Sequence, residues 1–74
     1  MIIKMYCVKD ELAGFSAPDY LKNEELAKRS FTNMTKTSPY SKDLSLWEVG
    51  TFDEESGTVI GITPKLIMRG EKNE

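Results

Sequence analysis

The chain lacks histidine altogether and has a single cysteine, Cys7, among its 74 residues. Without histidine, the usual general base of Ser/His and Cys/His couples is missing, and so are the common zinc-ligand patterns. One cysteine permits no intrachain disulfide, so we interpret Cys7 as a small buried hydrophobic residue in a reducing compartment. A glycine-rich phosphate loop and a CxxC pair are absent as well. We therefore predict a protein that is not an enzyme and needs neither a metal nor a cofactor.

Long apolar runs are also missing. The most apolar segment, "IIKMYCV" near the N-terminus, is interrupted by Lys4 and is far shorter than the ~20 residues that a membrane-spanning helix needs. No small-residue cleavage site follows it, as a signal peptide would require. We expect an intracellular protein that makes no contact with a membrane.

The charge balance has no excess of basic residues, with 10 Lys and Arg against 12 Asp and Glu and a formal net charge of −2. Proteins that bind duplex DNA mainly through its phosphates are usually basic, so this balance argues against that class. It leaves open a local basic patch. It also leaves open single-strand binding, in which aromatic rings stack on bases and supply part of the energy.

Local patterns predict four elements: a strand at 2–9, a helix at about 24–36, and strands at 44–52 and 58–63. The helix has Asn23 as its N-cap, acidic residues in its first turn and one apolar stripe. In "DEESG", between the last two strands, an aspartate starts the turn and Gly57 supplies a left-handed residue, which is typical of a hairpin. The segment at 15–22 contains Pro18 and is interpreted as an irregular connection.

The resulting order, β-α-β-β, predicts an α+β fold in which one helix packs on a three-stranded, mainly antiparallel sheet. The chain is long enough for one small domain, which we place at 1–69, followed by a flexible C-terminal tail at 70–74. A domain of this size has a thin margin of stability, and association with a second copy is a natural way to bury more surface. We therefore expect a homodimer.

The predicted strands at 2–9 and 44–52 each carry apolar residues on both faces. In the first strand, Ile3, Met5 and Cys7 share one parity and are predicted to form the core face, while Ile2, Lys4, Tyr6 and Val8 share the other. In the strand at 44–52, Leu44 and Leu46 lie opposite Trp47 and Val49. Phe52 joins the Trp47 side if a β-bulge occurs at Gly50. One helix can cover only one of these faces.

Three interpretations of the uncovered face remain open. The aromatic side chains can pack beneath the chain's own loop at 36–43 or the segment at 65–69. The face can instead be buried in a homodimer, with the following interface residues: Leu44, Leu46, Trp47, Val49 and Phe52. In the third interpretation, Tyr6 and Trp47 stack on the bases of a single strand.

Three segments carry a resemblance to a known family. They are "VKDELAGF", "NEELAKRSF" and "DLSLWEVGTFDEESGTV". They resemble the small non-structural protein of gokushovirus-type phages of the family Microviridae. The matching positions of the helix are Ala27, Arg29 and Phe31, and those of the hairpin are Asp43, Leu46, Trp47, Val49, Gly50, Phe52, Asp53, Ser56, Gly57 and Val59. The similarity covers roughly residues 6–68.

The resemblance implies a non-enzymatic phage protein in the cytoplasm of the infected host. Such proteins are described as DNA-binding, or as factors that turn replication toward single-strand synthesis and packaging. The predicted partners are single-stranded DNA and viral replication or assembly proteins. Tyr6 and Trp47 are the predicted stacking residues, and the predicted phosphate contacts are Lys4, Lys9, Lys28, Arg29 and Lys42. Two alternatives stay open: a module that binds only proteins, and an Arg29 that merely pairs with Glu25 on the helix surface.

Overall fold

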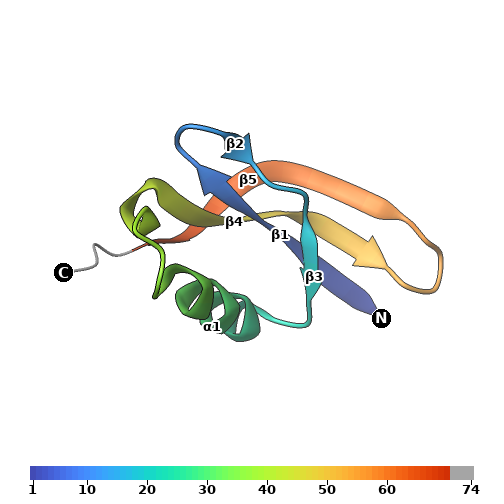
Figure 1. The fold of residues 1–74 in the computed structure, drawn as a ribbon. Helices are drawn as coiled ribbons and strands as arrows, with labels where there is room; N and C mark the ends of the chain where they lie inside the picture. The colour runs from blue at the N-terminus through green and yellow to red at the C-terminus, as the bar shows by residue number, and fades with distance from the viewer. Residues whose placement is uncertain (71–74) are drawn as a thin grey trace.

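The structure is a computed structural model that describes residues 1–70. Its elements, in chain order, are β1 (Ile2–Asp10), β2 (Gly14–Phe15), β3 (Asp19–Leu21), α1 (Glu24–Thr35), the 3-10 turn η1 (Ser41–Asp43), β4 (Leu44–Asp53) and β5 (Val59–Arg69). The strands form one curled antiparallel sheet, a half-barrel, with α1 on one of its faces (Figure 1). Of the predicted tail, only Gly70 is described, and its N–H donates to the Leu44 carbonyl over 2.8 Å. Residues 71–74 lie outside the described residues.

The sheet contains five strands, so the predicted three-stranded sheet is wrong. The long strands follow the order β1-β4-β5, and both β2 and β3 pair with β1 on its other side. These two additional strands lie within or next to the segment that was interpreted as irregular. They are two and three residues long and Pro18 separates them, so neither is long enough to show the period of two that marks a strand.

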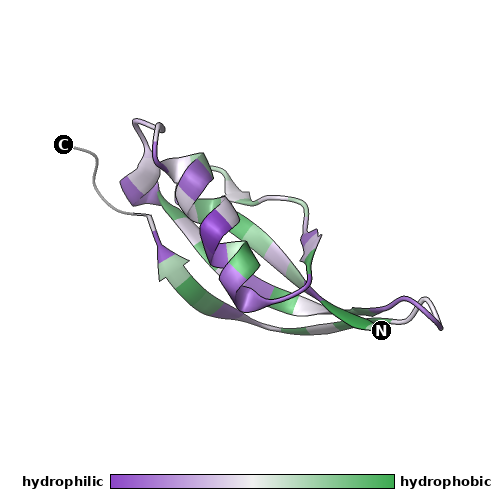
Figure 2. Ribbon diagram, turned by 90° about the horizontal axis from the view of Figure 1, so that it is seen from below, coloured by the Kyte–Doolittle hydropathy of each residue, from purple (hydrophilic) through white to green (hydrophobic). Residues whose placement is uncertain are grey.

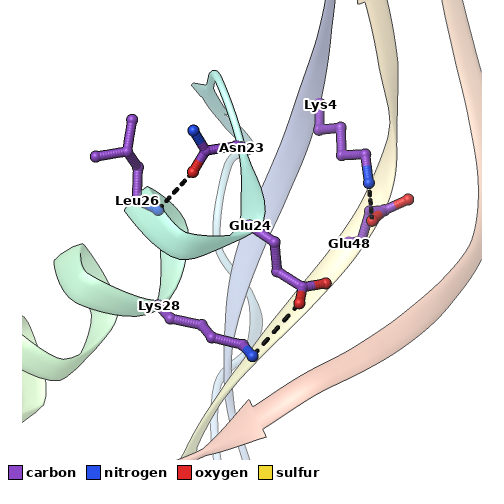
Figure 3. Close-up of polar contacts among 6 residues, drawn as sticks. All are labelled: Lys4, Asn23, Glu24, Leu26, Lys28 and Glu48. Carbon is purple, nitrogen blue, oxygen red and sulfur yellow. Dashed lines mark hydrogen bonds and ion pairs between the residues drawn. The ribbon is translucent and has the colours of Figure 1, made fainter.

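The helix and the hairpin turn are confirmed. The Asn23 side chain accepts a hydrogen bond from the Leu26 N–H over 2.9 Å, which caps the first turn of α1 (Figure 3). At the hairpin, Asp53 accepts from the Glu55 N–H over 2.9 Å, and Gly57 has a φ of 74°, the left-handed conformation that favours glycine. These features depend on neighbouring residues alone, which is why the sequence predicts them well.

Strand β5 continues well past its predicted end at residue 63. It includes Pro64 and reaches Arg69. Because β4 is the one strand within residues 1–70 that pairs with β5, the other side of β5 is an edge, and an edge strand tolerates a proline whose missing N–H is not needed for pairing. The apolar cluster after Pro64 is therefore part of the sheet.

A β-bulge in β4 sets which side chains share a face. The register with β1 runs from Met5 opposite Gly50 directly to Tyr6 opposite Glu48, so Val49 is the extra residue. This shift places Trp47 and Phe52 on the same face of the sheet, and Leu44 and Leu46 on the other. The bulge predicted at Gly50, with its effect on Trp47 and Phe52, is confirmed to within one residue.

The core lies between α1 and the sheet. Its buried members are Tyr6, Ala27, Phe31 and Leu46, with Val8, Leu21, Leu44, Ile67 and Met68 packed around them. Figure 2, turned by 90° from Figure 1, shows α1 lying across this face while the β4–β5 hairpin extends beyond the helix. Ile3, Met5 and Cys7 were predicted to form the core face; Met5 and Cys7 are buried, but this parity is not the one that packs under the helix. Tyr6 and Val8 do so instead.

Candidate functional site

Four aromatic rings lie on the face of the sheet that is turned away from α1. Phe15 of β2 contacts Trp47 of β4 edge to face, with 5.8 Å between ring centroids. Tyr20 of β3 contacts Phe52 of β4, with 5.5 Å between centroids. Each pair reaches across β1, because β1 lies between β4 and the two short strands. We call Phe15, Tyr20, Trp47 and Phe52 together the aromatic face.

The rings shield the floor of this face. Met5 and Cys7 of β1 share the parity of the aromatic face, and both are buried although no helix covers them. Phe15 and Tyr20 stay accessible, 47% and 56% exposed, whereas Trp47 and Phe52 are half-buried. Burial raises the pKa of the Cys7 thiol, with a smaller contribution from Asp19. A raised pKa keeps this cysteine in its unreactive thiol form.

The orientation of the Trp47 ring is fixed by a hydrogen bond. Its indole N–H donates to the Ser45 hydroxyl over 2.7 Å, two residues back on the same strand. The edge-to-face contact with Phe15 holds the ring from another side. A ring held in this way offers a rigid surface on which a planar group can stack without a large further loss of conformational entropy.

A cation lies among the rings. The Lys9 ammonium is 5.5 Å from the centroid of Phe15 and 5.8 Å from that of Trp47, within the range of cation–π attraction. Of the positions predicted as phosphate contacts, Lys9 is the one that the structure places beside Trp47. A phosphate next to a base stacked on Trp47 would lie within reach of this ammonium.

The aromatic face carries no acidic residue at the positions that the strand pairing assigns to it. These positions include the four rings together with Ile3, Met5, Cys7, Lys9, Ser45, Gly50, Val59, Gly61, Leu66 and Arg69. The carboxylates are elsewhere, for example on the first turn of α1 and in the turn at 53–55. The positions of the aromatic face are therefore free of carboxylates, and Asp19 of β3 is a carboxylate near enough to act on Cys7.

Tyr6 does not belong to this face. Its side chain is 2% exposed beneath α1, so its predicted role as a stacking residue is wrong. The physical reason is the register, which puts Tyr6 opposite Glu48 on the helix side. Burial raises the pKa of the Tyr6 phenol, and the negative charges of Glu48 and Glu24 raise it further. Among the described residues, no group makes a hydrogen bond to its hydroxyl.

The other predicted phosphate contacts are dispersed. Lys4 forms an ion pair with Glu48 over 3.4 Å on the helix side of the sheet, and Lys28 pairs with Glu24 over 3.4 Å on α1 (Figure 3). Arg29 lies on α1 and is exposed, with no ion pair to a described residue, so the alternative pairing with Glu25 is not formed. Lys42 is exposed on η1. The structure does not gather these four residues with Trp47.

The predicted dimer interface is divided between the two faces. Leu46 is buried in the core, so its prediction as an interface residue is wrong. Leu44 is partly buried and packs against the same core, on the helix side of the sheet. Trp47 and Phe52 lie on the aromatic face, and Val49 is the bulged residue beside them. An interface through Trp47, Val49 and Phe52 stays a prediction.

Sequence reasoning missed Phe15 and Tyr20. Both follow from the two short strands, whose pairing with β1 brings each ring diagonally within contact of an aromatic residue of β4. The signal that could have found them is the spacing of aromatic residues around Pro18, in a segment otherwise poor in large side chains. Without the pairing with β1, that spacing has no structural meaning.

Residues 1–70 also contain a cavity of about 320 Å³ between the end of α1 and the end of β5. Its lining includes Phe31, Lys36, Met68 and Arg69 but no carboxylate and no cysteine, so it offers no acid–base pair. In this same part of the chain, no cluster of acidic or cysteine side chains is arranged to hold a metal ion. Nor does it contain a helix that is long and apolar enough to cross a membrane.

A family model described as "Phage ORF5 protein" matches residues 3–73, which is nearly the whole chain. The chain belongs to the phage ORF5 protein family. This assignment confirms that the chain is a phage protein, the coarser part of the resemblance seen in its sequence. No curated protein and no solved structure matches this ORF5-family chain. The aromatic face therefore has to be interpreted from its own chemistry.

Proposed function

We propose that this ORF5-family protein binds single-stranded DNA through its aromatic face, as a non-enzymatic factor in the replication or packaging of a phage genome. The observation that carries the proposal is the combination of four rings and Lys9 on one sheet face, at positions free of carboxylates. Stacking of a base on an aromatic side chain contributes about 1–3 kcal/mol and tolerates any sequence. The proposal includes action inside the infected host and membership of the Microviridae.

The proposal favours a single strand over a duplex on physical grounds. In a duplex the faces of the bases are stacked on one another and cannot reach the rings, whereas a single strand exposes them. The site has few cations, so binding to phosphates alone would be weak. For a single strand, stacking of bases on the rings can supply the binding free energy that the few cations of the face do not.

The test is the affinity for a short fluorescently labelled oligonucleotide at low salt, measured by anisotropy. We expect Phe15→Ala and Tyr20→Ala each to weaken binding by roughly 10-fold or more, since ~1.4 kcal/mol corresponds to 10-fold. Both rings are about half exposed, so these variants should keep the fold, which circular dichroism can verify. The quenching of Trp47, the only tryptophan, gives an independent readout of binding at this face.

Tyr40→Ala is the matched control. Tyr40 is 65% exposed and lies between α1 and η1, outside the aromatic face, so its removal should leave the affinity unchanged. Equal effects of all three substitutions would contradict a defined site. If the wild-type protein fails to bind any oligonucleotide, the proposal is overturned and a protein-binding role for the aromatic face, the alternative that the sequence leaves open, becomes the one to test.

A further inference from the structure

The outer edge of β5 is the most exposed part of the sheet. Every residue from Val59 to Leu66 is exposed, and four of them are large and apolar: Val59, Ile60, Ile62 and Leu66. On its inner side β5 pairs with β4, and no described strand pairs with its outer side. An edge of this kind presents unpaired backbone groups that can accept another strand.

Only the first half of this edge is suited to pairing. Pro64 has no N–H to donate, Lys65 places a charge next to it, and the register with β4 shifts on both sides of Leu66 and Lys65. Proline, lysine and bulges are the features with which proteins block an edge. The residues from Val59 to Thr63 include no proline and no lysine, and Val59, Ile60 and Gly61 pair with β4 in regular register, with the shift beginning after Gly61. Any strand added to β5 is therefore confined to this short segment.

We propose that Val59–Thr63 pairs antiparallel with the same segment of a second copy, about a two-fold axis at Gly61. In this register Ile60 lies opposite Ile62 of the second copy, and Gly61 lies opposite its own counterpart. The match is apolar against apolar at the centre. The pairing also places the turn that contains Asp53, Glu54 and Glu55 beside Lys65 of the second copy, so opposite charges meet at each end.

The symmetry has a consequence for the aromatic face. A two-fold axis between antiparallel strands is perpendicular to the sheet, so the same face of both copies points in the same direction. Two aromatic faces would then lie side by side on one continuous sheet, and two strand segments bound to them would run in opposite directions. This part of the inference rests on the proposed function, whereas the pairing of β5 does not.

Gly61→Cys tests the pairing directly. A Cβ at residue 61 meets no atom within 4 Å, so the substitution is compatible with the fold. Directly opposed residues of antiparallel strands have Cα atoms ~4.5–5.5 Å apart, which fits a disulfide. Under mild oxidation we expect most of this variant to form a covalent dimer. Leu12→Cys, on the exposed turn between β1 and β2, is the control for random collision, and wild type controls for the buried Cys7.

Charge substitutions supply the second readout, the molar mass in solution measured by light scattering. Ile60→Lys/Ile62→Lys places like charges opposite each other and should give the mass of one chain. Ile60→Glu/Ile62→Lys pairs opposite charges across the same axis and should restore the mass of two. Crosslinking of Gly61→Cys no greater than that of Leu12→Cys would overturn the proposal. So would a wild-type mass of one chain at a protein concentration of ~0.1 mM, which is well above the dissociation constant of a dimer with micromolar affinity. Neither result bears on DNA binding by the aromatic face, which the oligonucleotide titration tests separately.

Discussion

Both faces of the sheet carry large apolar side chains but are completed in different ways. On one face, a 12-residue helix covers Tyr6 and Leu46 and leaves them almost fully buried. On the other, aromatic rings from neighbouring strands cover Met5 and Cys7, and two of these rings, Phe15 and Tyr20, remain exposed themselves. A helix hides its apolar stripe when it packs, whereas a layer of rings presents a new apolar surface. The first arrangement stabilises the fold, and the second leaves part of an apolar surface accessible.

The largest expected difference between the faces is in the effect of removing a ring. Phe31→Ala, in the core, should lower the free energy of unfolding by about 3–5 kcal/mol, enough to unfold much of so small a domain. Phe15→Ala, on the aromatic face, should cost about 1 kcal/mol or less because its ring is half exposed. Urea denaturation followed by circular dichroism measures both. Similar losses at the two positions would show that the aromatic face is a second core.

A smaller effect is expected where β4 and β5 approach each other at the bulge. A Cβ on Gly50 would collide with the backbone carbonyl oxygen of Ile60, so Gly50→Ala should lower the free energy of unfolding by about 1–3 kcal/mol. Its pairing partner, Gly61, meets no atom within 4 Å, and Gly61→Ala should be neutral or stabilise slightly. Thermal denaturation of the two variants measures the contrast. Equal stability would mean that the strands are not held this closely.

Tyr6→Phe should have the smallest effect on stability near neutral pH and should be neutral or stabilising. The substitution removes a buried hydroxyl that has no hydrogen-bond partner among the described residues and keeps the ring. The pKa of Tyr6 is raised above its ordinary value of 10.0 in the folded state. The contribution of its protonated phenol to the free energy of unfolding is therefore complete below pH 10 and is lost as the pH rises further. Tyr6→Phe should therefore flatten the alkaline loss of stability, leaving the part that Cys7 contributes. A Tyr6→Phe variant that is much less stable at pH 7 would show that the hydroxyl makes a stabilising hydrogen bond, which contradicts this description.

The sequence predicts what depends on neighbouring residues and fails where distant strands must meet. The cap at Asn23 and the turn before Gly57 have short-range causes, and both are confirmed. Strands β2 and β3 exist only because β1 pairs with them, so their two or three residues carry no pattern of their own. For the same reason the sequence does not decide which parity of β1 packs under α1. Both parities are apolar, and only the register with β4 decides that Tyr6 faces α1.

The candidate site was predictable in part for the same physical reason. Three residues of the site lie on long strands: Lys9, Trp47 and Phe52. Their position on the face of the sheet opposite to that of Leu46 follows from the alternation of side chains and one bulge. Phe15 and Tyr20 reach the aromatic face only through the two short strands that no local pattern reveals. Basic residues such as Lys28 and Arg29 were grouped by charge alone, and the helix that carries them packs on the opposite side of the sheet.

The most direct test is to map the residues that respond when a short single-stranded oligonucleotide is added to the isotopically labelled protein, by nuclear magnetic resonance. If the aromatic face binds the strand, the largest shifts should occur at the Trp47 indole N–H and at the backbone of Lys9, Phe15 and Tyr20. Residues of α1, on the far side of the sheet, should shift little. Shifts concentrated on α1, or none at saturating oligonucleotide, would contradict the claim that the aromatic face is the binding surface.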